Sequence, residues 1–405
     1  MKLNIEKYRV GYVFQDEYPW DIRVEKITSS LSDAGIGTVI ISRNRTSLPV
    51  TERLNQSLLI QRLPGPSLGW LRTLINFPAF FSPVWFWRIY RTVVERKLSL
   101  LIVRDLPLSI TCWLVARMCR IPVIMDMAEN YPAMIQDTWD FRGRDRFDYI
   151  LRNPRVLRMM EYWITKRLDG IMTVSPASQA RVRSIPGVKP GAVWVIQNTP
   201  MLEKAGQLRA SELSERMRCV GILKLLYVGG MEESRGLMMI IESLPEVIKS
   251  AGQTMLIIVG EGTSRTGLEA KVGELGLESS VVFSGWLDQS YVPGIIAESD
   301  ICLVPHLVTE HIDTTVPNKI FDYMAQSKPV LVTQSKSLRN IVEGYHCGGW
   351  YEDKSSQSFS DAIEKLADRA QREQLGRNGK RAVDEYLNWE TDSSELVRIA
   401  KGFID

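Results

Sequence analysis

The hydrophobic and polar positions along the chain alternate between two patterns. Short apolar runs occur at 8–14, 38–42, 100–104, 122–126, 170–174 and 193–197. Between them lie longer stretches in which apolar residues recur at helical spacing, such as 24–33, which ends just before Gly35. Short strands separated by helix-length segments predict a parallel sheet with crossover helices.

The same alternation restarts in the second half of the chain. Apolar runs follow at 223–229, 255–260, 281–284, 301–305 and 330–333, and a polar segment, 203–218, separates them from the first set. We therefore expect an α/β protein with two doubly wound, Rossmann-like domains and a cleft between them. The expected bounds are 1–200 for the first domain, 201–220 for a linker and 221–385 for the second domain.

Length and charge sharpen this picture. A chain of 405 residues suits two domains, and 45% hydrophobic with 24% charged residues excludes a wholly disordered or coiled-coil protein. The net charge of +3 conceals an asymmetry, because residues 1–200 contain 28 Lys and Arg against 17 Asp and Glu, and the remainder contains 22 against 30. The basic half predicts an anionic partner, either nucleic acid or membrane headgroups. No recognisable nucleic-acid-reading motif is present, so nucleic acid is not expected.

An aromatic segment at 70–89 favours the membrane. Tryptophan and phenylalanine are concentrated there beside Arg72, Arg88 and Arg91, which is typical of a segment at a lipid interface, and a second basic stretch, 142–158, leads into Trp163. Arg72, Pro78 and Arg88 interrupt the aromatic run, so a spanning helix is not expected. The alternatives are a helical hairpin packed on its own domain and a solvated basic helix face.

The N-terminus and the cysteines bear on the compartment. The first ten residues lack the apolar core and cleavage site of a signal peptide. Five scattered cysteines without C-x-x-C spacing predict buried, reduced thiols and no zinc site. We therefore expect a cytoplasmic protein that is peripheral at the inner face of the membrane.

Ligands of such sheets bind at the carboxyl ends of the strands. After the strand at 223–229 come Gly229 and Gly230, which let a ligand approach the backbone, and then Arg235, which can clamp a phosphate. Gly260, Glu261 and Gly262 follow the next strand. A dinucleotide fingerprint needs a third glycine, but Arg265 stands at that position, so hydride transfer is not supported.

The loop after 301–305 carries the most polar groups. Thr315 and Pro317 predict the cap and first turn of a helix whose buried face holds Phe321 and Met324. Free backbone N–H groups from about 316 to 319 would then face a diphosphate, and Lys319 adds a cation. Asp322 can accept hydrogen bonds from a ribose diol, or it pairs with Lys319 or Arg339.

These motifs resemble the retaining glycosyltransferases of family 4, which have the two-domain GT-B fold. In the second half the resemblance rests on the glycine turn 229–236, on Gly260-Glu261-Gly262 and on Asp322-Tyr323-Met324-Ala325. In the first half it rests on Asp21-Ile22-Arg23-Val24 and on the stretch from Asp126 to Pro132 that contains Glu129 and Asn130. The resemblance also implies a C-terminal helix, 386–405, that returns to the first domain.

The resemblance implies transfer of a sugar from a nucleoside diphosphate sugar to a lipid-linked or saccharide acceptor with retention of anomeric configuration, in surface polysaccharide synthesis. No D-x-D occurs, and neither a metal nor a cofactor is expected. The expected catalytic residues are Arg235, Lys319 and Glu129, with Glu129 orienting or deprotonating the acceptor hydroxyl. The expected donor-binding residues are Gly229, Gly230, Arg235, Gly260, Glu261, Thr314, Thr315, Asn318, Lys319 and Asp322, and the expected acceptor-binding residues are Asp21, Arg23, Glu129 and Asn130.

Two positions depart from the family pattern. Thr314 stands where the family has the first of two glutamates, with Glu310 and Asp313 as candidate replacements, and Ala128 stands where many relatives have histidine. Two other functions therefore stay open: a nucleotide-sugar epimerase of the same fold, and a catalytically inactive partner of a glycosyltransferase.

Overall fold

The computed structural model describes residues 8–19, 21–64, 82–143, 152–205, 209, 211–218 and 221–404. The chain divides into two compact units. The first contains residues 1–136, 143–197 and 392–405, and the second contains 137–142 and 198–391. The segment expected to be a linker, 201–220, thus belongs to the second unit, where it contributes two short helices.

The first unit is built on an eight-stranded sheet with the order β3-β4-β2-β1-β5-β6-β7-β8. Its strands are β1 (Tyr8–Phe14), β2 (Gly37–Ser42), β3 (Thr51–Arg53), β4 (Leu58–Arg62), β5 (Leu100–Arg104), β6 (Val123–Met127), β7 (Gly170–Thr173) and β8 (Val193–Val195). All neighbours are parallel except β3 and β4. The central strands are buried on both faces, as their near-continuous apolar sequences require.

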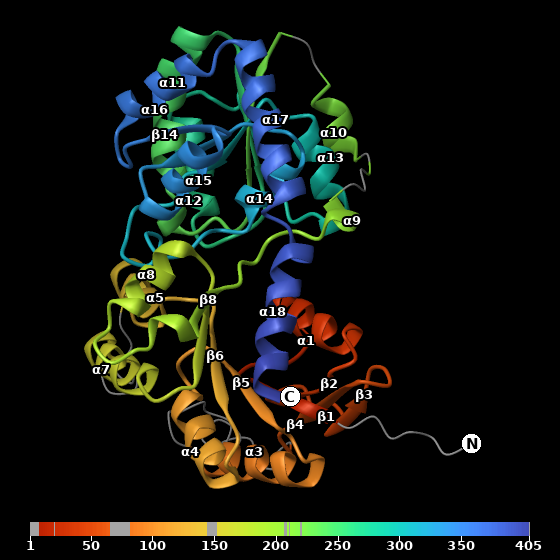
Figure 1. The fold of residues 1–405 in the computed structure, drawn as a ribbon. Coiled ribbons are helices and arrows are strands. Elements are labelled where there is room, and N and C mark those ends of the chain that lie inside the picture. The colour runs from red at the N-terminus through yellow and green to blue at the C-terminus, as the bar shows by residue number, and fades with distance from the viewer. Residues whose placement is uncertain are drawn as a thin grey trace. The chain divides into compact units, whose positions relative to one another are not determined.

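Helices lie on both sides of this sheet (Figure 1). They are α1 (Ile22–Asp33), α3 (Pro83–Arg96), α4 (Ser109–Cys119), α5 (Tyr131–Arg142), α7 (Pro154–Thr165), α8 (Pro176–Arg183) and the 3-10 turn η1 (Pro190–Ala192). Residues 137–142 of α5 belong to the second unit. The last helix, α18 (Trp389–Ile404), begins in the second unit, and its residues from 392 onward belong to the first.

The second unit has a six-stranded parallel sheet with the order β11-β10-β9-β12-β13-β14. Its strands are β9 (Leu223–Val228), β10 (Thr254–Val259), β11 (Val281–Gly285), β12 (Ile301–Val304), β13 (Val330–Thr333) and β14 (Gly348–Tyr351). Its helices are α9 (Leu202–Ala205), α10 (Glu212–Arg216), α11 (Leu237–Ala251), α12 (Arg265–Glu274), α13 (Val292–Ala297), α14 (Lys319–Ala325), α15 (Lys336–Tyr345), α16 (Ser356–Lys365) and α17 (Arg369–Glu385), with 3-10 turns η2 (Glu233–Arg235) and η3 (Gln289–Tyr291).

The prediction of two doubly wound, Rossmann-like domains is confirmed, and every predicted strand is present. Three strands were not predicted: β3, β4 and β14. The run at 58–62 ends in Gln61 and Arg62, whose polar side chains conceal a strand that is buried throughout. Two glycines begin β14 and weaken its strand signal.

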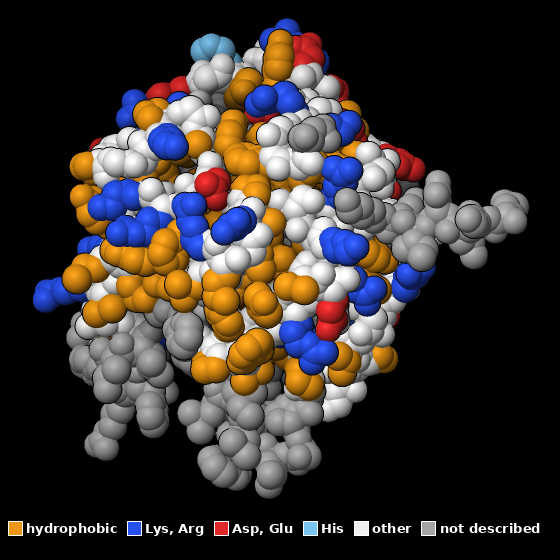
Figure 2. Space-filling model, turned by 60° about the horizontal axis from the view of Figure 1, so that its bottom comes forward, with side chains coloured by type: hydrophobic (Ala, Val, Ile, Leu, Met, Phe, Trp, Pro, Cys, Tyr) orange, Lys and Arg blue, Asp and Glu red, His pale blue; other side chains and the backbone are white. Residues whose placement is uncertain are grey.

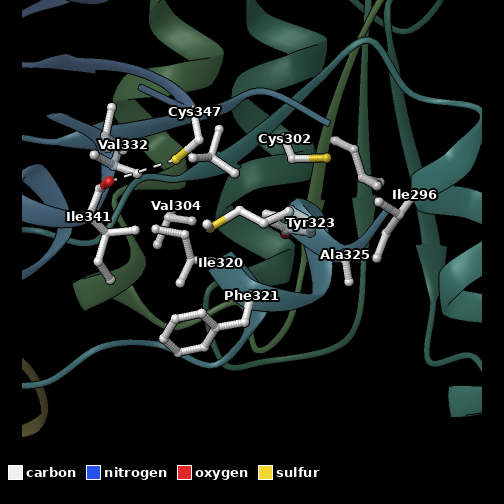
Figure 3. Packing of buried hydrophobic residues seen from close by; sticks show 14 of the residues in the cluster. Ile296, Cys302, Val304, Ile320, Phe321, Tyr323, Ala325, Val332, Ile341 and Cys347 are labelled. Carbon is white, nitrogen blue, oxygen red and sulfur yellow. Dashed lines mark hydrogen bonds between the residues drawn. The ribbon is translucent and has the colours of Figure 1, made fainter. Parts of the chain in front are cut away.

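The core of the second unit packs α14 against the sheet (Figure 3). Phe321 and Met324 are both buried there, so the predicted buried face of this helix is confirmed. Cys302 and Cys347 lie in the same cluster, and the Cys347 thiol donates to the Ile341 carbonyl oxygen at 3.8 Å (Figure 3). The four described cysteines are all free, whereas Cys219 lies outside the described residues.

The aromatic segment is only partly described, since residues 65–81 are outside the described ranges, as are 144–151 of the basic stretch. The end of the aromatic segment, from Pro83 onward, forms the first turns of α3. Trp85 was expected at a lipid interface, but this was wrong, because its side chain is 0% exposed and α3 packs against α4. Trp87, two positions on, is 59% exposed. In the part of the chain that the structure describes, no helix is both long and apolar enough to cross a membrane.

Candidate functional site

The glycine loops after β9 and β10 pack on each other through their backbones. The Gly229 N–H donates to the Val259 carbonyl oxygen at 2.8 Å. Gly260 has φ +136°, and a β-carbon there would lie 2.1 Å from the Gly229 carbonyl oxygen. Only glycine fits this position. The contact between the two loops therefore already explains Gly260 without a ligand, and Glu261 forms an ion pair with Arg265.

Arg235 is brought to the end of β12 by a second close approach. It ends the turn η2, and Gly236, with φ +69°, follows it. A β-carbon at Gly236 would lie 2.1 Å from the Pro305 carbonyl oxygen, and the Leu307 N–H donates to the Ser234 carbonyl oxygen at 3.0 Å. The segment that carries Arg235 thus runs directly beside the residues that follow β12.

Lys319, the first residue of α14, reaches the glycine loop. Its Nζ lies 4.0 Å from the centre of the Tyr227 ring, and a β-carbon at Gly229 would be 2.6 Å from the same Nζ. The Tyr227 hydroxyl donates to the Gly230 carbonyl oxygen at 2.6 Å, which holds the ring under the ammonium group. Gly229, Gly230 and Lys319 are therefore gathered at the carboxyl end of β9, as predicted from the loops.

Neither of these two cations has a counter-ion within the described part of the chain. The buried Nε of Arg235 has no hydrogen-bond partner there. Burial and the nearby charge of Arg235 lower the pKa of Lys319 well below its usual value, and Asp322 opposes this shift. Asp322 itself is exposed, and Arg339, which we considered as its partner, pairs with Glu343. Among the described residues, these two basic groups thus lie near each other and neither forms an ion pair with a carboxylate, although the charge of Asp322 acts on Lys319.

His306 completes this cluster, and sequence reasoning missed it as a site residue. Its side chain is 1% exposed, and neither ring nitrogen has a hydrogen-bond partner among the described residues. Burial, followed by the charges of Lys319 and Arg235, lowers the pKa of His306 well below its usual value, so the ring is neutral. The available signal was its place, directly after Pro305 at the end of β12.

The segment before α14 differs from its prediction. The helix begins at Lys319, so Pro317 precedes it and Thr315 is not its cap. The Thr315 hydroxyl instead donates to the His311 carbonyl oxygen at 2.7 Å, and the Thr314 hydroxyl donates to the same oxygen at 3.0 Å. The predicted cap was wrong because the His311 carbonyl oxygen, within the loop, accepts hydrogen bonds from both hydroxyls. Asn318 is exposed and makes no capping hydrogen bond with its side chain.

In the first unit, the predicted acceptor residues Asp21 and Arg23 are committed to internal contacts. Asp21 caps α1, and its Oδ1 accepts from the Arg23 and Val24 N–H groups at 2.9 and 3.0 Å. The Arg23 guanidinium is 2% exposed and donates to both carboxylate oxygens of Asp126, the shortest at 2.6 Å, and to the Gln197 carbonyl oxygen. Arg23 therefore has a structural role that its sequence position did not reveal.

A buried network surrounds this ion pair. The Tyr12 hydroxyl donates to Asp126 at 2.6 Å, and Arg104 contacts the carboxylates of Asp21, Asp105 and Asp126 at 3.3, 3.1 and 3.5 Å. Burial opposes ionisation of Asp126, but the charges of Arg23 and Arg104, followed by hydrogen bonds from Arg23 and Tyr12, lower its pKa. Sequence reasoning missed Tyr12, Arg104 and Asp105, although Arg104 and Asp105 stand at the end of β5.

Asp105 fixes the loop that presents Glu129. Its Oδ1 accepts from the Ala128 and Glu129 N–H groups at 2.9 and 3.1 Å, and its own backbone is left-handed, with φ +56°. Burial raises the pKa of Asp105 to about 6, with Arg104 opposing and Glu129 and Asp126 adding to the rise. Glu129 is half-buried beside it, and Asn130 is buried at the start of α5.

Two family models match the two units in turn. Residues 22–199 match the model described as "Glycosyl transferase 4-like domain", and residues 223–369 match the one described as "Glycosyl transferases group 1". Together these ranges take up most of the chain. With the two Rossmann-like sheets, they place the chain among the glycosyltransferases of the GT-B fold.

Individual proteins resemble the chain more distantly. An uncharacterised glycosyltransferase of Methanocaldococcus jannaschii is 26% identical over 256 residues, which span 62% of this chain and 64% of that protein. Other curated relatives are matched over less than half of their length. Sucrose-phosphate synthase of Thermosynechococcus elongatus has a similar fold, with TM-score 0.78 and 16% identity over 98% of both chains. Anabaena HepE, solved in complex with UDP, also has a similar fold, with TM-score 0.73 and 14% identity over 97% of this chain and all of that one.

Proposed function

We propose that the protein transfers a sugar from a nucleoside diphosphate sugar and holds the donor diphosphate between Arg235 and Lys319. The observation that supports this is a pair of basic side chains at the carboxyl ends of β9 and β12 that form no ion pair with any residue the structure describes. Ligands of doubly wound sheets bind at this end of the strands. A diphosphate would supply the negative charge that the cluster lacks, and would restore the ordinary pKa of Lys319.

The same two groups suit the chemistry of sugar transfer. As the anomeric bond breaks, negative charge accumulates on the departing diphosphate. Cations that are already in place stabilise this charge without reorganising solvent. Arg235 binds a phosphate through two parallel hydrogen bonds, and Lys319 supplies a point charge. Retention of configuration and a lipid-linked or saccharide acceptor are part of the proposal through the resemblance to family 4.

On the acceptor side, we assign Glu129 the task of orienting or deprotonating the acceptor hydroxyl. It is half-buried at the carboxyl end of β6, and Asp105 holds its backbone N–H. A general base must keep a fixed position relative to its substrate, and the hydrogen bond from the Glu129 N–H to Asp105 fixes the position of the Glu129 backbone. Asp21 and Arg23 enter the proposal only as supports of the same network.

We further propose that the first unit docks on anionic lipid. Its exposed apolar side chains Trp87, Met118, Met159, Tyr162 and Trp163 form, with Arg91, Arg117, Arg155 and Arg158, what we call the aromatic–basic surface. The Trp113 and Trp163 rings are 5.3 Å apart, which joins α4 to α7, and α3 packs on α4. Figure 2 views the side on which α3 and α4 lie in Figure 1, and shows hydrophobic side chains among Lys and Arg with few Asp or Glu.

The charge of this surface matches a lipid headgroup layer. The acidic residue of α7, Glu161, is buried and paired with Arg181 at 2.7 Å, so the exposed side of this helix is basic and apolar. Aromatic rings at the acyl boundary and guanidinium groups at phosphates are the usual arrangement of an interfacial helix. A surface polysaccharide acceptor carried on a polyprenyl diphosphate would be met at this layer.

The transferase proposal is tested with a panel of nucleoside diphosphate sugars. The full chain is incubated with UDP-, GDP- and ADP-sugars, and release of the nucleoside diphosphate is followed with and without added acceptors. UDP-sugars come first, because HepE, a protein of similar fold, was solved with UDP. We expect one base to support binding and slow release, and Glu129→Gln to lower release while leaving donor binding unchanged. If no donor binds to the wild type, the proposal fails.

A further inference from the structure

His306 lies near enough to Lys319 and Arg235 for both charges to act on its ring, and the ring has no hydrogen-bond partner of its own within the described ranges. Gly236 touches the carbonyl of Pro305, and Leu307 bonds to Ser234, so contacts on both sides of His306 hold it against the segment that carries Arg235. The His306 carbonyl oxygen accepts from the Thr333 hydroxyl at 2.8 Å, which fixes the backbone while the ring stays unbonded.

A buried imidazole without hydrogen-bond partners is energetically unfavourable unless it binds a ligand. A neutral ring carries one N–H donor and one acceptor, and leaving such groups buried without partners destabilises the fold. Protonation would not relieve the cost, because Lys319, Arg235 and His311 are the charged or titratable groups that act on the ring, and each disfavours the imidazolium. A phosphate oxygen would satisfy the ring N–H and the two cations together.

We propose that His306 is a third ligand of the donor diphosphate and donates its ring N–H to a phosphate oxygen that Arg235 and Lys319 also bind. This inference rests on the proposed function. Because the ring is 1% exposed, a side chain of the site has to shift as the ligand enters. His306 remains neutral before binding, and the bound anion raises its pKa.

Calorimetric titration of the full chain with UDP and with uridine separates the diphosphate from the base. His306→Phe keeps a ring but no hydrogen bond, and His306→Asn keeps a side-chain N–H donor. His346→Asn is the matched control, because His346 is exposed at the end of α15 and its left-handed backbone accepts Asn. We expect His306→Phe to weaken UDP roughly 10- to 100-fold, as loss of a hydrogen bond to a charged group does, with uridine unchanged. His306→Asn should lie between, and His346→Asn should match the wild type.

A second readout uses the unaltered protein, in case His306→Phe does not fold. In protein labelled at histidine carbons, UDP should shift the ring resonance of His306 and raise its pKa, whereas uridine should do neither. An unmoved resonance, or equal UDP affinity of His306→Phe and wild type, overturns the inference and leaves the donor site intact. Failure of the wild type to bind any nucleoside diphosphate overturns the proposed function and the inference with it.

Discussion

The two units carry basic side chains at the same place in their sheets, the carboxyl ends of the strands, but use them differently. In the first unit, Arg23 and Arg104 are surrounded by the carboxylates of Asp21, Asp105 and Asp126. In the second, Arg235 and Lys319 lie beside each other and a neutral His306, without a paired carboxylate among the described residues.

The difference shows what a charge cluster is for. Buried charges that already have partners hold a fold together and leave little capacity for a ligand. Partly buried charges that repel each other are tolerated where a ligand of opposite sign binds to them, which is how binding sites differ from structural networks. Removing a charge should therefore have opposite consequences in the two units, and the following changes test this.

The largest effect is expected from Asp126→Ala in the first unit. The change leaves the buried Arg23, Arg104 and Tyr12 without their shared partner, which should lower the free energy of unfolding by about 3–5 kcal/mol. Denaturant unfolding measures it, with Asp33→Ala at the exposed end of α1 as the control. The UDP affinity of the folded variant should match that of the wild type. A loss of affinity would contradict the view that the first cluster stabilises the fold and only the second binds the diphosphate.

Asp105→Asn should change how stability depends on pH. The folded pKa of Asp105, about 6, lies above its usual 3.8, so its contribution to stability is full below pH 4 and is lost as pH rises through 6. The stability of Asp105→Asn relative to the wild type should therefore rise by about 2 kcal/mol between pH 4 and pH 7. Denaturant unfolding at both pH values tests this, and parallel curves for the two proteins would contradict it.

Arg235→Gln should weaken binding of the donor without destabilising the second unit. Loss of charge-assisted hydrogen bonds to a phosphate corresponds to roughly 10- to 100-fold in UDP affinity. The unfolding midpoint should be unchanged, since Arg235 has no ion pair to lose in the described structure. Calorimetry measures the UDP affinity, and thermal melting of the same sample measures the unfolding midpoint. A large fall in melting temperature would show that Arg235 has a structural role.

The smallest effect is expected at the aromatic–basic surface. The double variant Trp87→Ser, Met159→Ser should bind vesicles of phosphatidylserine and phosphatidylcholine several-fold more weakly, because two exposed apolar side chains are lost. Trp286→Ser is the control, since Trp286 is 74% exposed in the second unit. Flotation of the three proteins measures binding, and equal flotation would refute membrane docking through this surface.

Local patterns predicted all the described strands except β3, β4 and β14, because burial on both faces leaves a clear apolar run, and they predicted which loops carry polar groups, because parallel strands end at one edge. They predicted Arg235 and Lys319 as neighbours for the same reason. They failed at Thr315, because its hydroxyl can either cap a helix or donate to a carbonyl oxygen within its own loop, and it does the latter. They also failed at Arg23, because its partner Asp126 lies 103 positions away.

His306 shows a further limit of sequence reasoning. A histidine after a buried strand is equally compatible with a satisfied core residue and with a ligand. Only the structure tells that its nitrogens are without partners in the described ranges and that its neighbours are cations. Whether the His306 ring nitrogens find hydrogen-bond partners depends on contacts from β12, η2 and α14 together. No local sequence pattern contains this information.

The most direct test of the central claim is the stability of Lys319→Met with and without UDP. Without the nucleotide, the variant should be more stable than the wild type by ~1 kcal/mol, because a half-buried cation on which the charge of Arg235 acts is removed. With saturating UDP the order should reverse, because only the wild type gains the full binding energy. A variant that is less stable than the wild type without UDP, and gains as much from it, would contradict the assignment of this cluster to a diphosphate.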